Sequence, residues 1–269
     1  MTLWEIILLG ILQGATEFLP ISSSGHLVLV PAILKWPAPS LSLVAIVHQG
    51  TLVAVLIYFF QDLWGIVKGV FAGLKQRQPL ATAESRLGWF IVLGSIPAAI
   101  AGLTLESFFE EAFGAPLVAA SFLLVTAVLL VVGEKLLSGK KLLENITLPD
   151  ALVVGLFQMM ALFPGVSRSG STITAGLMRG LDRATAARFS FLLGVPAILG
   201  AGLLSGLDII RADDLAAQLP TMAAGFLAAA VSGYLCIHFL LNWLKSHSLY
   251  LFAAYCALFG GIYLLTALI

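Results

Sequence analysis

Residues 13–26, with the sequence QGATEFLPISSSGH, bring together several groups that can do chemistry within a strongly apolar part of the chain. They include the carboxylate of Glu17, the imidazole of His26 and four hydroxyl side chains. A carboxylate or an imidazole can take up and release a proton, and a serine hydroxyl beside such a base can act as a nucleophile. This segment is therefore a candidate catalytic site.

A second polar segment, residues 164–174 with the sequence PGVSRSGSTIT, is related to the first by an internal repeat. When the chain is aligned with itself at an offset of 145 residues without a gap, six of sixteen positions are identical. The matched pairs are Gly10 and Gly155, Gln13 and Gln158, Phe18 and Phe163, Ser22 and Ser167, Ser24 and Ser169, and Gly25 and Gly170. We infer two halves, each with a polar break in an apolar helix, and a site where the two breaks meet.

The composition identifies an integral membrane protein. Of the 269 residues, 60% are hydrophobic and only 10% are charged, with a mean hydropathy of +1.04, whereas soluble domains have about 25% charged residues. The net charge is zero, which argues against a nucleic-acid partner. No basic region followed by a cleavage site opens the chain, so the first apolar run is expected to remain in the protein.

The apolar stretches predict an all-α membrane fold with six transmembrane helices and two re-entrant helix pairs. A spanning helix needs about 20 apolar residues. Six stretches meet this length, at about residues 41–60, 88–106, 116–136, 187–206, 218–241 and 249–268. Two more, residues 3–34 and 150–178, are interrupted near the middle by Pro, Gly and Ser. Broken backbone is tolerated at membrane depth only where protein or water covers it, so these two are predicted to enter and leave on one side.

The charges in the loops predict the orientation of the chain. Three loops are basic and two are mainly acidic. The basic loops are residues 61–87, 137–149 and 242–248, and the acidic loops are residues 107–115 and 207–217. Because basic loops face the cytoplasm, both termini are expected outside, and the two helix pairs are expected to enter from opposite sides. The chain is then a single membrane domain, an inverted repeat of about residues 1–136 and 146–269.

In the first polar segment, Gln13, Thr16 and Glu17 have the spacing that places three side chains on one face of a helix. Pro20 is expected to end this helix, because the residue before a proline avoids helical backbone angles. An ionisable residue at this depth is costly and points to a function. The alternative is an ion pair between Glu17 and Arg168 that only locks the two halves together.

The second polar segment has the features of an anion-binding helix start. Residues 167–170 lead into a helix, whose N-terminus offers unpaired N–H groups and the positive end of the helix dipole. Serine and threonine also often serve only as helix caps, but Arg168 adds a guanidinium that can hold two phosphate oxygens. His48 and Gln49, inside the first predicted span, either pack between helices or lie around the cavity.

The two segments resemble the motifs of the bacitracin-resistance family of undecaprenyl pyrophosphate phosphatases. The first motif of that family begins with Glu or Gln, followed after three residues by Glu, and corresponds to residues 13–17. It continues with Pro-x-Ser-Ser-[Ser/Thr]-Gly-His, which corresponds to residues 20–26. Its second motif, Pro-Gly-x-Ser-Arg-Ser-x-x-Thr, corresponds to residues 164–172. The resemblance covers essentially the whole chain. It implies an enzyme that removes the terminal phosphate from a C55 polyprenyl diphosphate, regenerates the lipid carrier for envelope synthesis, and depends on Mg²⁺ or Ca²⁺.

The resemblance also implies the residues of the site. The residues expected to be catalytic are Glu17, Ser23, His26 and Arg168, and those expected to bind phosphate are Ser22, Ser167, Arg168, Ser169, Gly170 and Thr172. The cation is expected at Glu17 with Gln13 nearby; many members have Glu at position 13, and an amide cannot contribute that negative charge. Either His26 or Ser23 attacks the phosphorus, or His26 activates a water molecule, and we favour chemistry at His26 with Ser23 assisting.

Two other classes of protein share parts of this pattern. Inverted repeats with broken helices are typical of many transporters, so the alternative function is a polyprenyl-phosphate flippase or anion transporter that uses the same site. Type 2 lipid phosphatases have related signatures, but this chain has Thr174 where that family has a histidine. The expected partners are a polyprenyl diphosphate lipid and the membrane, with a homodimer as a possible assembly. The expected location is the bacterial inner membrane, with the site open to the outer side.

Overall fold

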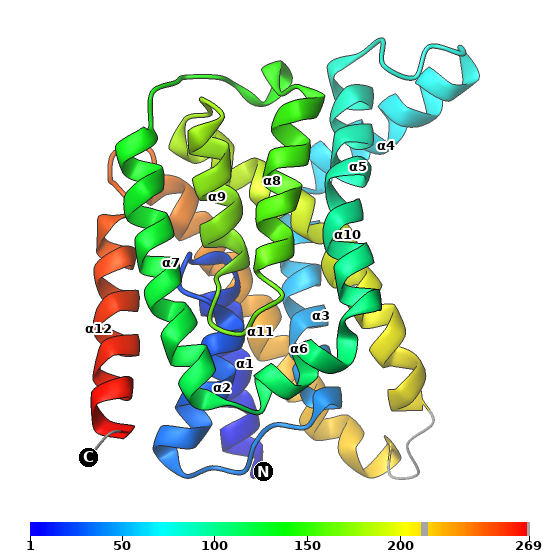
Figure 1. Cartoon of the computed structure of the whole chain (residues 1–269). Helices are drawn as coiled ribbons and strands as arrows, with labels where there is room; N and C mark the ends of the chain where they lie inside the picture. The colour runs from blue at the N-terminus through cyan, green and yellow to red at the C-terminus, as the bar shows by residue number, and fades with distance from the viewer. Residues whose placement is uncertain (211–214, 268–269) are drawn as a thin grey trace.

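The structure is a computed structural model that describes residues 1–210 and 215–267. Within these residues the chain forms helices and no strand (Figure 1). The helices are α1 Leu3–Phe18, α2 Ser23–Leu34, α3 Leu41–Tyr58, α4 Phe60–Lys75, α5 Ala83–Thr104, α6 Glu106–Phe113, α7 Pro116–Leu136, the short 3₁₀ helix η1 Leu143–Asn145, α8 Leu148–Met160, α9 Arg168–Met178, α10 Arg183–Ile210, α11 Leu215–Trp243 and α12 Tyr250–Ala267. The predicted all-α class is confirmed.

Six helices in the described part of the chain are long and apolar enough to cross a membrane. They are α3, α5, α7, α10, α11 and α12, one for each predicted span. Many large apolar side chains on them are exposed at the surface of the molecule, as expected for helices whose outer faces contact lipid. The prediction of a multi-pass membrane protein is confirmed.

Two of the predicted loops contain helices. α4 fills most of the basic loop after the first span, and α6 fills most of the acidic loop after the second. The sequence explains α4, because Asp62 in its first turn and Lys75 in its last turn complement the helix dipole. Residues 211–214, in the other acidic loop, lie outside the described residues.

The two broken helices form hairpins that enter the bundle from opposite ends. α1 and α2 make the first hairpin, whose open end lies near the chain termini, and α8 and α9 make the second hairpin, whose open end lies at the other end of the bundle (Figure 1). The tips meet near the middle of the bundle (Figure 1). This arrangement agrees with the predicted topology of two opposed hairpins, while the boundaries of the two repeats stay a prediction.

Both hairpins begin with the same kind of helix cap. At the start of α1, the Thr2 N–H donates to Glu5 Oε2 (2.7 Å), and the Glu5 N–H donates to Thr2 Oγ1 (3.3 Å). At the start of α8, the N–H and the hydroxyl of Thr147 both donate to Asp150 Oδ2, at 2.9 and 2.7 Å. The two threonines are 145 residues apart, as are the two acidic residues. The repeat seen at the tips therefore extends to the bases of the hairpins.

Asp150 anchors the base of the second hairpin. Its side chain is fully buried, and it binds Lys141 Nζ at 2.7 Å and Arg179 Nε at 2.8 Å. Burial alone would raise the pKa of this carboxyl. Hydrogen bonds from Lys141, Thr147 and Arg179 lower it by more than burial raises it, so that the pKa of Asp150 is about 2. These ion pairs fasten α8 to the chain on both sides of the hairpin.

The hairpin tips also share a serine cap. Ser22 Oγ accepts the N–H of Gly25 at 3.2 Å, and Ser167 Oγ accepts the N–H of Gly170 at 3.0 Å. Each cap satisfies one of the N–H groups that a helix start leaves unpaired. The caps therefore allow α2 and α9 to begin at the centre of the bundle, where no bulk water is available to bind these groups.

The two tips bind each other as well as their own helices. The Gly165 N–H lies 3.4 Å from Ser24 Oγ, to which it donates, and Ser169 Oγ donates to Leu19 O at 3.1 Å. Gly165 has a φ of +96°, and a Cβ at this position would lie 2.1 Å from Ala119 O. A residue with a side chain would therefore be strained and would also clash, so the turn needs glycine.

Candidate active site

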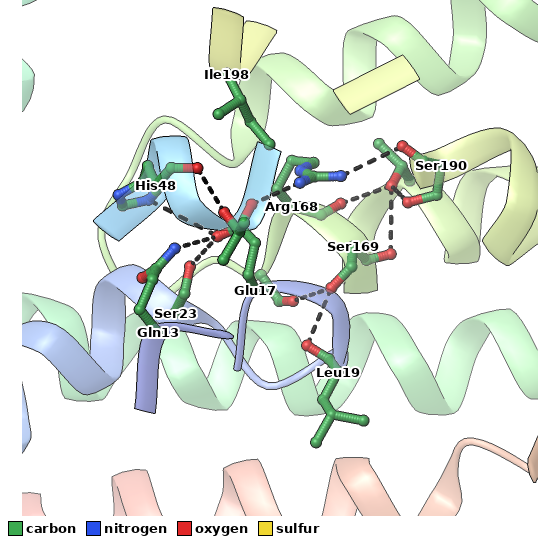
Figure 2. A network of polar contacts seen from close by, with 12 residues as sticks. Gln13, Glu17, Leu19, Ser23, His48, Arg168, Ser169, Ser190 and Ile198 are labelled. Atoms are coloured by element: carbon green, nitrogen blue, oxygen red, sulfur yellow. Dashed lines mark hydrogen bonds and ion pairs between the residues drawn. The ribbon is translucent and has the colours of Figure 1, made fainter. Parts of the chain in front are cut away.

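Glu17 lies in the last turn of α1, at the centre of the bundle. Its side chain is 6% exposed, and Arg168 Nη2 donates to its Oε1 at 2.5 Å. Arg168 is the first residue of α9, so this ion pair joins the two hairpins (Figure 2). A buried carboxylate needs such a partner, because removing a single charge from water is strongly unfavourable. The ion pair considered as an alternative from the sequence is present, within a wider polar network.

The second oxygen of Glu17, Oε2, is approached by three further groups. Ser23 Oγ donates to it at 2.6 Å, and Gln13 Nε2 donates to it at 2.9 Å (Figure 2). His48 Nε2, from α3, lies 3.7 Å away. His48 Nδ1 carries the ring hydrogen, since it lies 2.7 Å from Val44 O and a carbonyl can only accept. The carboxylate is thus surrounded by polar groups from four helices.

Arg168 is held from the side opposite Glu17 by α10. Its Nη1 donates to Ser190 O at 3.3 Å. One turn further along α10, a Cβ at Gly194 would lie only 2.3 Å from Nη1, so glycine leaves the space that the guanidinium fills. The side chain of Arg168 is 15% exposed and that of His48 is 27% exposed. The network is therefore not sealed inside the protein.

The residues predicted to bind phosphate lie beside this network, but their hydrogen bonds hold the hairpin tips together. The buried members are Ser22, Ser167, Ser169, Gly170 and Thr172. Ser167 Oγ lies 3.1 Å from Ser169 Oγ in addition to capping Gly170. Thr172 Oγ1 donates to Arg168 O at 2.6 Å and lies 2.6 Å from Ser190 Oγ. Apart from Arg168, these residues shape the site, and their contact with phosphate stays a prediction.

His26 lies at the first hairpin tip but outside the network around Glu17. Its Nδ1 is 2.7 Å from Ser22 O, and its Nε2 is 2.7 Å from the hydroxyl of Tyr255 on α12. In the described part of the chain, these are the hydrogen-bond partners of its ring. The structure therefore brings the other three predicted catalytic residues into contact and places His26 apart from them.

The sequence predicts a divalent cation at Glu17 with Gln13 nearby, and the oxygen atoms present fit such an ion. Gln13 Oε1 is buried and has no hydrogen-bond partner among residues 1–210 and 215–267, while Nε2 of the same amide binds Glu17. Carboxylate and amide oxygens are the ligands that Mg²⁺ and Ca²⁺ prefer. The described residues contain no group of three or more His, Cys, Asp or Glu side chains placed to hold a metal. Further ligands must then come from substrate or water.

Sequence reasoning did not identify Ser190, Gly194 and Tyr255. The first two are one helical turn apart in α10 and both face Arg168. Small and hydroxyl residues at four-residue spacing in an apolar span were a usable signal, because they mark a face that packs closely. Tyr255 carried no such signal, since tyrosine is also common at membrane interfaces. For His48, the 3.7 Å contact with Glu17 supports the alternative of a residue that lies around the site.

Comparisons with known proteins match nearly the whole chain to one family. The family described as bacitracin resistance protein BacA matches residues 6–262. Three relatives named undecaprenyl-diphosphatase are similar along nearly their full length. The relative from Thermomicrobium roseum is 44% identical over 272 residues, which cover 98% of this chain and 98% of the relative. The relative from Trichlorobacter lovleyi is 46% identical over 256 residues (95% and 93%), and that from Chlorobium limicola is 45% identical over 279 residues (99% and 98%).

Proposed function

The chain belongs to the family of the bacitracin resistance protein BacA, and from this premise we propose that it hydrolyses undecaprenyl diphosphate to undecaprenyl phosphate and inorganic phosphate. One observation carries the proposal: Ser23 and Arg168, from opposite hairpins, both contact the carboxylate of Glu17. A nucleophile, a base and a cation that can bind phosphoryl oxygens are the groups that phosphoryl transfer needs. The lipid product is the carrier that is used again in cell-envelope synthesis.

In the proposed reaction, Ser23 Oγ attacks the terminal phosphorus of the lipid diphosphate. Its proton passes to Glu17 Oε2, 2.6 Å away, as the new O–P bond forms and the bond from phosphorus to the bridging oxygen breaks. Undecaprenyl phosphate leaves with the bridging oxygen and receives the proton held by Glu17. Water then cleaves the phosphoserine, and its two hydrogens end on Ser23 and on inorganic phosphate.

The geometry favours Ser23 over His26 as the attacking group. A general base must lie within hydrogen-bonding reach of the proton that it takes, and Glu17 meets this condition for Ser23. Both ring nitrogens of His26 are engaged by Ser22 and Tyr255. The sequence-based preference for chemistry at His26 is therefore replaced here by a serine nucleophile.

Arg168 supplies the positive charge of the site. At rest its guanidinium neutralises Glu17. When Glu17 takes the proton from Ser23, the carboxylate becomes neutral and attracts the guanidinium less strongly. The guanidinium can then bind the phosphoryl oxygens, on which negative charge builds during the transfer.

A divalent cation is proposed to bind Gln13 Oε1 and Glu17 together with substrate and water oxygens. When bound, such an ion neutralises phosphate charge. Gln13→Glu adds a negative charge to this ligand set, so this variant should bind Mg²⁺ or Ca²⁺ more tightly. The measurement is binding of the cation alone to the purified protein by calorimetry. Equal or weaker binding by the variant would remove position 13 from the ion site.

The proposed location is the bacterial inner membrane, with the site open to the outer side. The basic loops before α5, between α7 and α8, and between α11 and α12 lie at the end opposite the termini (Figure 1), which the positive-inside rule places in the cytoplasm. In a variant without Cys236 and Cys256, a membrane-impermeant thiol reagent applied to intact cells should label a cysteine at Thr2 but not one at Lys140. The reverse pattern would overturn the orientation. The homodimer stays a prediction.

The activity is tested by phosphate release from undecaprenyl diphosphate by the purified protein in detergent. Release is expected from the unmodified chain and should be lost in Ser23→Ala and Glu17→Gln. Ser248→Ala, in the loop before α12, is the matched control and should behave as the unmodified chain. Rapid quenching with a substrate labelled at the terminal phosphate should give phosphoserine at Ser23. Binding and exchange of the lipid without phosphate release would instead support the transporter.

A further inference from the structure

His26 is enclosed by aromatic side chains of α12 at the tip of the first hairpin. Its residue exposure is 2%. The ring lies nearly parallel to those of Tyr255 and Phe259, with centroids 5.6 and 5.0 Å away and interplanar angles of 8° and 9°. Stacking of this kind fixes the plane of the imidazole, so both ring nitrogens have fixed directions.

The two hydrogen bonds of the ring determine where its hydrogen lies. Ser22 O is a carbonyl and can only accept, so Nδ1 of His26 carries the hydrogen and donates at 2.7 Å. In the neutral ring Nε2 is then an acceptor, and the Tyr255 hydroxyl donates to it at 2.7 Å. The lone pair that could take a proton or attack phosphorus is therefore occupied by Tyr255.

The carbonyl that His26 binds belongs to an unusual backbone conformation. Ser22 has φ +70° and ψ +98°, on the positive-φ side that residues other than glycine rarely adopt. Its carbonyl accepts from the backbone N–H of His26 at 3.2 Å and from Nδ1 at 2.7 Å. This turn is followed at once by Ser23, whose hydroxyl points to Glu17. The direction of the Ser23 side chain thus depends on a backbone turn that His26 helps to hold.

The second hairpin provides an internal reference for this arrangement. Ser171 stands 145 residues after His26, and its Oγ donates to Ser167 O at 2.7 Å, as His26 Nδ1 does to Ser22 O. Ser167 has φ −69° and ψ +120°, which is an ordinary extended conformation. At the second tip, where the backbone is relaxed, a serine is sufficient to bind the carbonyl of the capping serine. At the first tip, where the backbone is unusual, the larger His26 binds this carbonyl and also reaches α12.

We propose that Tyr255 is a positioning residue of the phosphatase, which acts through His26 to hold the Ser22 turn and so directs Ser23 Oγ at Glu17. This inference rests on the proposed function, because its readout is phosphate release. Neither Tyr255 nor His26 exchanges a proton with substrate. The α12 helix, which contributes no group to the network around Glu17, thereby sets the geometry of the nucleophile.

The test uses side chains that keep one of the two hydrogen bonds of His26. His26→Asn places an N–H near the position of Nδ1, so it can still donate to Ser22 O, but it has no group that titrates or attacks near neutral pH. His26→Ala removes both bonds. Tyr255→Phe keeps the stacked ring and removes only the hydroxyl. Tyr263→Phe, on the same helix, is the matched control. All variants are purified as the full chain and compared for thermal unfolding in detergent before assay.

The expected losses follow from misplacement of the nucleophile. His26→Ala should lower kcat by roughly 100-fold, and His26→Asn should recover at least about a tenth of the wild-type kcat, since one of two hydrogen bonds remains. Tyr255→Phe should lower kcat by about tenfold and change KM by less than about twofold, because one hydrogen bond outside the substrate site is lost. Tyr263→Phe should match the unmodified chain.

A double-mutant cycle separates action through His26 from a general effect of α12. Because Tyr255 acts through His26, adding Tyr255→Phe to His26→Asn should cause no further loss of kcat. Additive losses, or a Tyr255→Phe variant with normal kcat, would overturn the positioning role. Equal inactivity of His26→Asn and His26→Ala, with normal unfolding temperatures, would instead place His26 in the chemistry. If the unmodified chain releases no phosphate, the proposed function itself is wrong. If it does release phosphate, the results for the variants test the positioning role of Tyr255 alone.

Discussion

At the tip of the first hairpin Ser23 follows the capping Ser22, and at the tip of the second hairpin Arg168 follows the capping Ser167. The two positions are 145 residues apart, and both side chains contact Glu17. The repeat thus delivers two side chains to one centre from opposite directions. One is a hydroxyl and the other is a guanidinium, so the same backbone places a nucleophile on one side of the carboxylate and a cation on the other.

The residues that differ between the tips carry the chemistry, and the residues that agree build the turns. Glu17 corresponds to Leu162, so only one tip brings a carboxylate to the centre. A second carboxylate there would repel the first and would compete for Arg168. The capping serines and the glycines at the third positions after them are the same in both tips. An asymmetric site can therefore form from a symmetric scaffold.

The largest effect should come from removing the cation of the second tip. Arg168→Ala deletes the guanidinium that neutralises Glu17 and binds phosphate, and kcat should fall by about 10³-fold or more. Arg188→Ala is the matched control, because Arg188 lies on α10 and pairs with Asp62. Phosphate release from undecaprenyl diphosphate is the measurement. Near-normal release by the Arg168 variant would mean that the second tip has only a structural role.

A smaller but still marked loss should follow from filling the space beside the guanidinium. Gly194→Ala places a methyl group in steric conflict with Arg168 Nη1, since the Cβ would be 2.3 Å from this atom. Displacing Arg168 by about 1 Å should lower kcat by roughly 100-fold. Gly200→Ala, on the same helix, is the control, because its Cβ would meet nothing within 4 Å. Equal activity of the two variants would show that the position of Arg168 is not critical.

The supports of the two tips should differ in strength. Thr126 Oγ1, on α7, donates to Gly165 O and accepts from the Ser167 N–H, both at 2.9 Å, whereas Cys256 Sγ, on α12, lies 3.8 Å from Pro20 O. Thr126→Val leaves two buried backbone groups unpaired and should destabilise the protein by about 2 kcal/mol or more.

Cys256→Ala removes only a weak thiol donor and a small buried volume, so its cost should be about 1 kcal/mol. Thermal unfolding in detergent compares the two variants. A greater loss of stability in the cysteine variant would reverse the assignment of the stronger support to the second tip.

The last comparison concerns the bases of the hairpins and depends on pH. Glu5, at the base of the first hairpin, lies among exposed residues, whereas Asp150, at the base of the second, is buried with a pKa of about 2. A carboxyl whose pKa is lowered by folding stabilises the folded state above its ordinary pKa of 3.8, and this stability is lost as the pH falls from there towards 2. The contribution of Asp150 is about 2 kcal/mol.

The measurement is unfolding temperature against pH for the unmodified chain and for Asp150→Asn, with Glu5→Gln as the control. The difference between the unmodified chain and Asp150→Asn should shrink between about pH 4 and pH 2, since the carboxyl becomes neutral in that range. A difference that stays constant down to pH 2 would show that the ion pairs of Asp150 do not stabilise the second hairpin.

Much of this molecule follows from local features of the sequence. The apolar stretches predicted the six spans. The repeated serine turns, together with Pro20 and Gly165, predicted two broken helices whose tips meet. The contact between Glu17 and Arg168 was also predictable, because a carboxylate and a guanidinium at the same membrane depth need partners.

The parts that sequence reasoning missed depend on packing between distant helices. In the sequence, Gly194 is one of many small residues in an apolar span. Its role becomes visible only in the structure, where α10 packs beside Arg168. The same holds for Tyr255, 229 residues away from the imidazole that it binds. The sequence also did not indicate that the ring of His26 lies against α12, and the catalytic role expected from its motif stays a prediction.

The two hydrogen bonds between the tips also limit how the molecule can move. In both, the second hairpin donates to the first: the Gly165 N–H donates to Ser24 Oγ, and Ser169 Oγ donates to Leu19 O. If either hairpin moved along the membrane normal relative to the other, both hydrogen bonds would break and Arg168 would separate from Glu17. Any rocking cycle that carried a lipid headgroup across the bilayer would have to displace the two hairpins as one rigid block, relative to the six spanning helices.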